Sequence, residues 1–106
     1  MNNIEITPKE LKSLLTQKNN IILLDVRTKK EIEIASIGGI NIPIDELSIK
    51  ITSLNKKSHI IIYCHHGIRS LKAVRILQYY GFKQVQHLKN GINAWSDIVD
   101  PSIRKY

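Results

Sequence analysis

The chain has 106 residues, of which 42% are hydrophobic and 24% are charged, and its formal net charge is +7. These values exclude an intrinsically disordered chain and predict a single domain over residues 1–106. A domain of this size has too small a core to enclose a large cavity. We therefore expect its functional site at an edge of the fold, on loops.

The positive charge is interpreted as a solubility charge spread over the surface. The basic residues come singly or in pairs such as Lys29 and Lys30, without a continuous stripe or interleaved aromatic side chains, which disfavours nucleic acid as a partner. The single cysteine excludes an internal disulfide and fits a reducing compartment. No signal peptide is apparent, and the apolar runs are too short to span a bilayer. We expect a cytoplasmic protein without a membrane partner.

Four segments rich in β-branched residues predict strands. Ile21–Leu24 and His59–Tyr63 are continuous apolar runs, which are typical of strands buried on both faces of a sheet. Shorter strands are expected at Ile4–Ile6 and Gln84–Leu88. Because the strands alternate with helical patterns, the predicted fold class is α/β, with a parallel sheet covered on both faces.

Helices are expected between these strands, and several carry their own start or stop signals. Thr7 is followed three residues later by Glu10, and Thr28 by Glu31, so each pair forms a capping box at a helix start. Gly81 is placed to end the helix before it. The helices expected in the second half of the chain lie at Asp45–Leu54, Ser70–Tyr80 and Gly91–Ile98.

Cys64 is the strongest candidate for chemistry because of its position. It follows an apolar strand at the carboxyl end, and a helix is expected to begin six residues later. Ligands bind at that edge of an open α/β sheet, and the unpaired N–H groups at a helix start favour an anion. A thiolate is stabilised there and can act as a nucleophile at neutral pH. The usual role of a lone cysteine, a small buried hydrophobic residue, is disfavoured by this position.

The residues that follow Cys64 are candidates for binding the substrate. Arg69 suits a tetrahedral oxyanion such as the sulfonate end of thiosulfate, or alternatively it braces a nearby carboxylate. Gly67 is expected to adopt a backbone conformation that is closed to other residues. His65 and His66 do not predict a zinc site, because adjacent side chains diverge and no fourth ligand lies at a suitable spacing. We expect one of them at the rim of the site.

A series of motifs, in this order and spacing, resembles a rhodanese domain over nearly the whole chain. The motifs are Leu24–Arg27, Glu31, Ile37–Gly39, Asn41–Pro43, Tyr63–Ser70, Asn90–Trp95 and Val99–Ser102. The resemblance implies a rhodanese-like three-layer fold, with a central, mostly parallel five-stranded sheet flanked by helices on both faces. It also implies that Cys64 carries sulfur as a persulfide. The substrate-binding residues that it implies are His65, His66, Gly67, Ile68, Arg69 and Ser70.

The activity implied by the resemblance is that of a thiosulfate sulfurtransferase. Its donor is thiosulfate or a protein persulfide, its acceptor is a thiol or cyanide, and it needs no metal or organic cofactor. Asp25, Arg27 and Glu31 are expected to give structural support, with Arg27 and Glu31 close enough to pair. Two departures from the family pattern, Ser36 and Asn90, bear on the detail of substrate preference.

Two other functions stay open at this point. One is an interaction or regulatory module of the same fold that turns nothing over; absence of Cys64 would favour it, and Cys64 is present. The other is a phosphate- or arsenate-handling enzyme, which is disfavoured by loop length. Four residues lie between Cys64 and Arg69, whereas cysteine phosphatases place one more there. The smaller ring of N–H groups suits one outer sulfur better than a tetrahedral phosphate.

Overall fold

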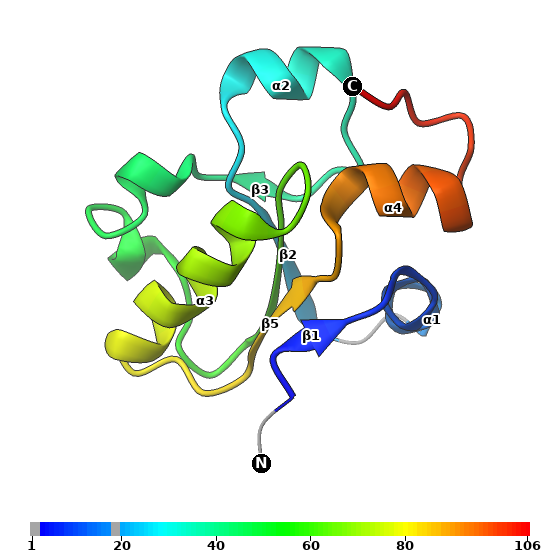
Figure 1. Cartoon of the computed structure of the whole chain (residues 1–106). Helices are drawn as coiled ribbons and strands as arrows, with labels where there is room; N and C mark the ends of the chain where they lie inside the picture. Colours follow the sequence, from blue (N-terminus) through cyan, green and yellow to red (C-terminus); the bar gives the residue numbers. More distant parts are fainter. Residues whose placement is uncertain (1–2, 18–19) are drawn as a thin grey trace.

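The computed structural model describes residues 3–17 and 20–106, and its centre is a five-stranded sheet (Figure 1). The strands lie in the order β1-β5-β4-β2-β3, and every pair is parallel, so their carboxyl ends meet at one edge. Their bounds are β1 (Glu5–Ile6), β2 (Ile21–Asp25), β3 (Ile40–Asn41), β4 (His59–Tyr63) and β5 (Val85–Leu88). The expected α/β class and five-stranded sheet are confirmed. A fifth strand was expected only because of the family resemblance, and no residue pattern predicted β3 at Ile40–Asn41.

Helices cover both faces of this sheet. In Figure 1, α3 lies on one side of the strands, α1 and α4 lie on the other, and α2 lies near the edge at which β2 ends. Their bounds are α1 (Pro8–Thr16), α2 (Lys29–Ile34), α3 (Ile68–Tyr79) and α4 (Gly91–Ile98). None of the helices in the described part of the chain is long and apolar enough to cross a membrane.

The central strand β4 divides the core into two clusters because its side chains alternate between the faces. Ile60, Ile62 and Cys64 belong to the cluster that α3 covers. Ile61 and Tyr63 belong to the cluster under α1 and α4. The alternation continues one residue past the strand, so it turns the side chain of Cys64 towards α3.

Both predicted capping boxes are confirmed. The Thr7 hydroxyl accepts a hydrogen bond from the Glu10 backbone N–H at 3.2 Å, and the Glu10 carboxylate accepts one from the Thr7 N–H at 2.9 Å. Thr28 and Glu31 make the same reciprocal pair at 3.3 and 3.2 Å. The second box sets the start of α2 and thereby the position of Glu31, whose carboxylate faces Arg69.

The predicted helix over Asp45–Leu54 is wrong. The segment contains two single turns of 3₁₀-helix, Ile44–Glu46 and Ile51–Ser53. The Leu47 N–H donates to the Ile44 carbonyl oxygen and the Leu54 N–H to the Ile51 carbonyl oxygen, which closes each turn. The Ser53 hydroxyl donates to the Lys50 carbonyl oxygen at 2.7 Å. Hydroxyl side chains of this kind compete for backbone groups and weaken a continuous α-helix.

The helix after Cys64 begins earlier than expected, at Ile68 instead of Ser70. Gly67 is its N-terminal cap and adopts a left-handed conformation, so the chain enters the helix directly after the glycine. At the other end Gly81 is left-handed as predicted, and its N–H donates to the Gln78 carbonyl oxygen at 3.0 Å. The loop between strand and helix is consequently short and tight.

Candidate active site

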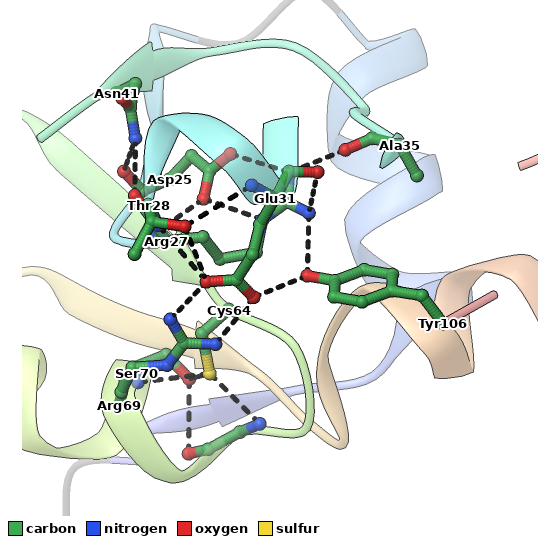
Figure 2. A network of polar contacts seen from close by, with 11 residues as sticks. Asp25, Arg27, Thr28, Glu31, Ala35, Asn41, Cys64, Arg69, Ser70 and Tyr106 are labelled. Carbon is green, nitrogen blue, oxygen red and sulfur yellow. Dashed lines mark hydrogen bonds and ion pairs between the residues drawn. The ribbon is translucent and has the colours of Figure 1, made fainter. Parts of the chain in front are cut away.

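The sulfur of Cys64 lies inside the first turn of α3. The backbone N–H groups of Gly67 and Ser70 both point at Sγ, with nitrogen–sulfur distances of 3.1 and 3.3 Å (Figure 2). The thiol also donates to the Ser70 hydroxyl oxygen at 3.4 Å. Cys64 is only 1% exposed. Two N–H donors beside the positive end of a helix dipole stabilise negative charge on this sulfur.

The tight turn depends on Gly67. Its φ of 105° lies in the region that L side chains rarely adopt, and an added Cβ would lie 3.3 Å from the backbone nitrogen of Asn90. Any other residue would therefore strain the backbone and press on the neighbouring loop. The expectation of a special backbone conformation at Gly67 is confirmed.

The start of α4 holds the carbonyl side of the same loop. Gly91 packs so closely that an added Cβ would lie 2.2 Å from the His65 carbonyl oxygen, and the Ile92 N–H donates to the Cys64 carbonyl oxygen at 2.9 Å. Asn90, a departure from the family pattern, has a φ of 62°, and asparagine tolerates this conformation better than most residues. This supporting role of Gly91 was not predicted from the sequence. The glycine of the closing motif was its only signal.

Arg69 binds a carboxylate. Its Nη1 and Nη2 atoms lie 2.6 and 2.9 Å from the two oxygens of Glu31, a bidentate ion pair between α3 and α2 (Figure 2). The hydrogen bonds from Arg69 hold the pKa of Glu31 well below its ordinary 4.5, and the same pair raises the pKa of Arg69. The structure shows Arg69 bracing a carboxylate, one of the two roles considered for it; binding of an oxyanion by Arg69 stays a prediction.

The expected pairing of Arg27 with the Glu31 carboxylate is wrong. Arg27 instead binds Asp25, with distances of 3.0 Å from Nε to Oδ1 and 2.8 Å from Nη2 to Oδ2, and it reaches only the backbone oxygen of Glu31. Spacing of four residues brings side chains together inside a helix. Arg27 precedes the cap of α2, so the rule does not apply to it.

Arg27 is fully buried, and its surroundings keep it charged. Burial disfavours the charged form, but hydrogen bonds with Asp25 and Tyr106 outweigh it and raise the pKa of Arg27 above its ordinary value. A further hydrogen bond runs from Nη2 to the Ala35 carbonyl oxygen at 2.9 Å. The Asp25–Arg27 pair thus ties the end of β2 to both ends of α2. The predicted role of structural support fits this geometry.

Tyr106 joins the two ion pairs, a role that no motif or spacing in the sequence indicates. Its hydroxyl donates to Glu31 at 2.7 Å and accepts from Arg27 Nη1 at 2.9 Å (Figure 2). Burial is the largest of the causes that raise the pKa of Tyr106 to about 12, so the phenol stays protonated at neutral pH. A continuous polar network therefore runs from Asp25 to Arg69, beside the Cys64 loop.

The remaining loop residues lie at the rim. The expectation that the adjacent side chains of His65 and His66 diverge is wrong, because their rings stack with 3.7 Å between centroids. The His65 ring also stacks on Tyr106 at 3.7 Å, and its Nε2 contacts the Tyr106 backbone oxygen. His66 is exposed, and Ile68 is 71% exposed. Within residues 3–17 and 20–106 no cluster of side chains is suited to hold a metal ion.

Comparison with known proteins agrees with this geometry. The rhodanese-like domain model matches residues 7–98. The chain belongs to the rhodanese-like domain family. A sulfurtransferase of Allochromatium vinosum is 31% identical over 93 residues, which cover 87% of each chain. A crystal structure of a rhodanese-related protein from Thermoplasma volcanium, 30% identical, superposes with a TM-score of 0.84 over 98% of this chain and 100% of that one.

Other relatives are longer proteins that contain this domain as one part. The adenylyltransferase and sulfurtransferase UBA4 of Scheffersomyces stipitis is 34% identical over 113 residues, which cover 95% of this chain but only 26% of that protein. The shared part is the rhodanese-like domain. These relatives support sulfur transfer as the general activity of the family to which this chain belongs.

Replacing Glu31 with glutamine tests the brace in this rhodanese-like domain. The change removes the negative charge that faces Arg69, so we expect the free energy of unfolding to fall by about 2 kcal/mol at pH 7. Because folding lowers the pKa of Glu31, its stabilisation is complete above the ordinary value of 4.5 and is lost as the pH falls below it. The difference in melting temperature between parent and variant should therefore shrink in acid.

The matched control is Glu46→Gln, which removes a carboxylate from an exposed pair with Lys50. Exposed pairs contribute about 0–1 kcal/mol, so this control should melt close to the parent. Glu31→Gln should keep sulfur transfer within a few-fold of the parent once corrected for folded protein. Loss of activity without loss of stability would show that Glu31 takes part in the chemistry.

Proposed function

We propose that the protein accepts a sulfane sulfur on Cys64 as a persulfide and passes it to a thiol or to cyanide. The donor is thiosulfate or a protein persulfide. The observation that carries this proposal is the position of Sγ, which faces the Gly67 and Ser70 N–H groups at the start of α3. A thiolate held there is a nucleophile.

The reaction proceeds by double displacement. The Cys64 thiolate attacks the outer sulfur of thiosulfate, a sulfur–sulfur bond forms to Cys64, and sulfite leaves with the electron pair of the broken bond. An acceptor thiolate or cyanide then attacks the outer sulfur, and Cys64 leaves as a thiolate. Backbone N–H donors that face developing charge on sulfur act as an oxyanion hole does, where removal of one donor costs about 3–4 kcal/mol.

In this proposal the backbone N–H groups contribute more to binding the anionic donor than the charge on Arg69 does. Its guanidinium is balanced by Glu31, and its side chain is 32% exposed. We attribute binding of the anionic donor to the loop from His65 to Ser70, whose outer surface carries the exposed His66 and Ile68. Arg69 contributes mainly by fixing the first turn of α3 against α2.

The test is retention of sulfur-35 after incubation with thiosulfate labelled at its outer sulfur. We expect the folded protein to hold about one label per chain, to release it to cyanide or to a thiol, and to hold none as Cys64→Ser. Equal labelling of the parent and Cys64→Ser would contradict the proposal. Failure of the parent to take label from thiosulfate or from a persulfide donor would favour the interaction module. Hydrolysis of an aryl phosphate would favour the phosphate-handling enzyme.

A further inference from the structure

His87 is a buried titratable residue that the proposed function does not use. It lies in β5 and pairs in register with Ile62 of β4, two residues before Cys64. It is only 4% exposed, and most of the buried residues around the sheet are apolar. Its Nδ1 atom lies 2.9 Å from the Ser70 hydroxyl oxygen. A buried imidazole with a polar partner needs an explanation, because burial of a titratable group is costly.

His87 is the middle of a line of polar groups that ends at the reactive sulfur. The Ser70 hydroxyl oxygen lies 3.4 Å from Cys64 Sγ on one side and 2.9 Å from His87 Nδ1 on the other. On the far side of the ring, Nε2 lies 3.8 Å from the Glu5 carboxylate. Carboxylate, imidazole, hydroxyl and thiol therefore follow one another behind the active-site loop. A nearby base is a usual way to activate a nucleophile. At 3.8 Å the Glu5 carboxylate makes no hydrogen bond to the ring and acts on it through its charge.

The line can carry a proton without any rearrangement of the backbone. When Cys64 is a thiol, its S–H donates to the Ser70 oxygen. The Ser70 O–H donates to the Gly67 carbonyl oxygen at 3.2 Å, and by rotating about its C–O bond it can donate to Nδ1 instead if the ring proton is on Nε2. One proton moves from Cys64 Sγ to the Ser70 oxygen, and another moves from the Ser70 oxygen to Nδ1. The S–H bond and the original O–H bond break, and new O–H and N–H bonds form. The products are a thiolate on Cys64 and an imidazolium on His87, with Ser70 restored as a hydroxyl.

We propose that His87 is a positioning residue that receives the Cys64 proton through Ser70 when the thiolate forms. This proposal rests on the proposed role of Cys64 as the nucleophile. The step needs no oxidant, reductant or cofactor. The imidazolium keeps the proton while sulfite leaves and can return it when Cys64 is released in the second displacement.

The surroundings of His87 suit a base that is neutral at rest. Burial lowers the pKa of His87, and the nearby Glu5 carboxylate opposes that shift. His87 also lies at the wall of an open cavity of about 840 Å³ that the loop residues Gly67 and Ile68 line as well. The other charged or titratable residues that line it are Glu5 from β1, His66 from the loop, and Lys72 and Arg75 from α3. Of these groups, Glu5 is the one that raises the pKa of His87. A thiolate on Cys64 adds a second nearby negative charge, which favours the imidazolium.

The first test is the pH dependence of Cys64 alkylation by iodoacetamide in His87→Asn. Asparagine can keep a hydrogen bond to Ser70 but cannot take up a proton. We expect the alkylation midpoint to rise by about one pH unit, so that the rate at pH 7 falls roughly tenfold. The plateau at high pH should not change, because the thiolate itself is unaltered. An alkylation profile that overlays the parent would overturn the proposal and leave His87 with a merely structural hydrogen bond.

The control variant is His59→Asn, which replaces the other strand histidine. His59 contacts the Gln86 side chain, at the opposite end of β4 from Cys64. Its alkylation profile should match the parent. A shift as large as that of His87→Asn would mean that loss of any sheet histidine disturbs the loop, and the proposal would fail.

The second test uses the reciprocal effect and does not depend on the folding of a His87 variant. The ring of His87 is titrated by NMR in the parent and in Cys64→Ala. Without a thiolate the imidazolium is less stable, so the His87 midpoint should fall by about one pH unit, the size at which two sites titrate as a pair. Equal midpoints would overturn the proposal. Neither test involves sulfur transfer, so failure of the sulfur-labelling experiment would be distinguished from failure of the His87 relay.

Discussion

Replacing Arg27 with leucine should lower the free energy of unfolding by about 3–5 kcal/mol, because it leaves a buried carboxylate without its partner. Asp25 and Arg27 are 1% and 0% exposed, and the guanidinium makes two hydrogen bonds to the carboxylate. The same change removes the hydrogen bonds to the Ala35 carbonyl oxygen and the Tyr106 hydroxyl. A small domain has a total stability of roughly 5–15 kcal/mol, so this single substitution should remove a large part of it.

Urea unfolding followed by the fluorescence of the single tryptophan, Trp95, measures the loss. Arg104→Leu is the matched control, because it makes the same chemical change at an exposed position, where the effect is usually within about 0.5 kcal/mol. Arg27→Lys keeps the charge but not the planar fork, and we expect it to fall between the two. A loss below about 1 kcal/mol for Arg27→Leu would show that the buried ion pair does not hold β2 to α2.

Much of the scaffold was predictable from local signals. The capping boxes of Thr7 and Thr28 fixed two helix starts, and the apolar run before Cys64 fixed the strand that carries it. The bounds of α4 were predicted correctly as Gly91–Ile98. These features depend on interactions between residues a few positions apart, and such interactions leave a pattern in the sequence.

Long-range polar partners were not predictable in the same way. Arg69 and Glu31 are separated by 38 residues, and Tyr106 and Glu31 by 75, so no spacing rule connects them. The sequence offered Arg69 a carboxylate partner without naming it, and only the approach of α2 to α3 shows that this partner is Glu31. His87 and Ser70 likewise meet because β5 lies beside β4 in the sheet order. A pairing that depends on which strands are neighbours leaves no periodic trace in the chain.

These long-range contacts explain why the four-residue loop after Cys64 keeps its shape. The Arg69–Glu31 pair fixes the first turn of α3, and Gly91 abuts the carbonyl oxygens of Cys64 and His65. The loop is thereby held from its helix side and from its carbonyl side. The size of the ring that faces the sulfur is consequently set by the number of residues in the loop, because its two ends cannot shift.

Inserting one glycine between Gly67 and Ile68 should therefore lower sulfur transfer from thiosulfate by about 10²-fold, because a misplacement of about 1 Å can cost that much. The insertion leaves Cys64 on its strand and the Ser70 N–H in the first turn of α3. It moves the Gly67 N–H, which now lies 3.1 Å from Sγ, relative to that turn. Glycine is chosen because it can adopt whatever backbone angles the longer loop requires.

The enlarged loop has the spacing that cysteine phosphatases use, so affinity for phosphate or arsenate should rise, or a trace of aryl-phosphate hydrolysis should appear. The control is a glycine inserted between the exposed Lys56 and Lys57, which lengthens a surface turn at the opposite end of β4 from Cys64. A far-UV spectrum and a melting curve establish that both variants fold. Transfer from thiosulfate by the folded loop variant at the parental rate would mean that ring size does not select sulfur over phosphate. The distinction from a phosphate-handling enzyme would then have to rest on the sulfur-labelling experiment alone.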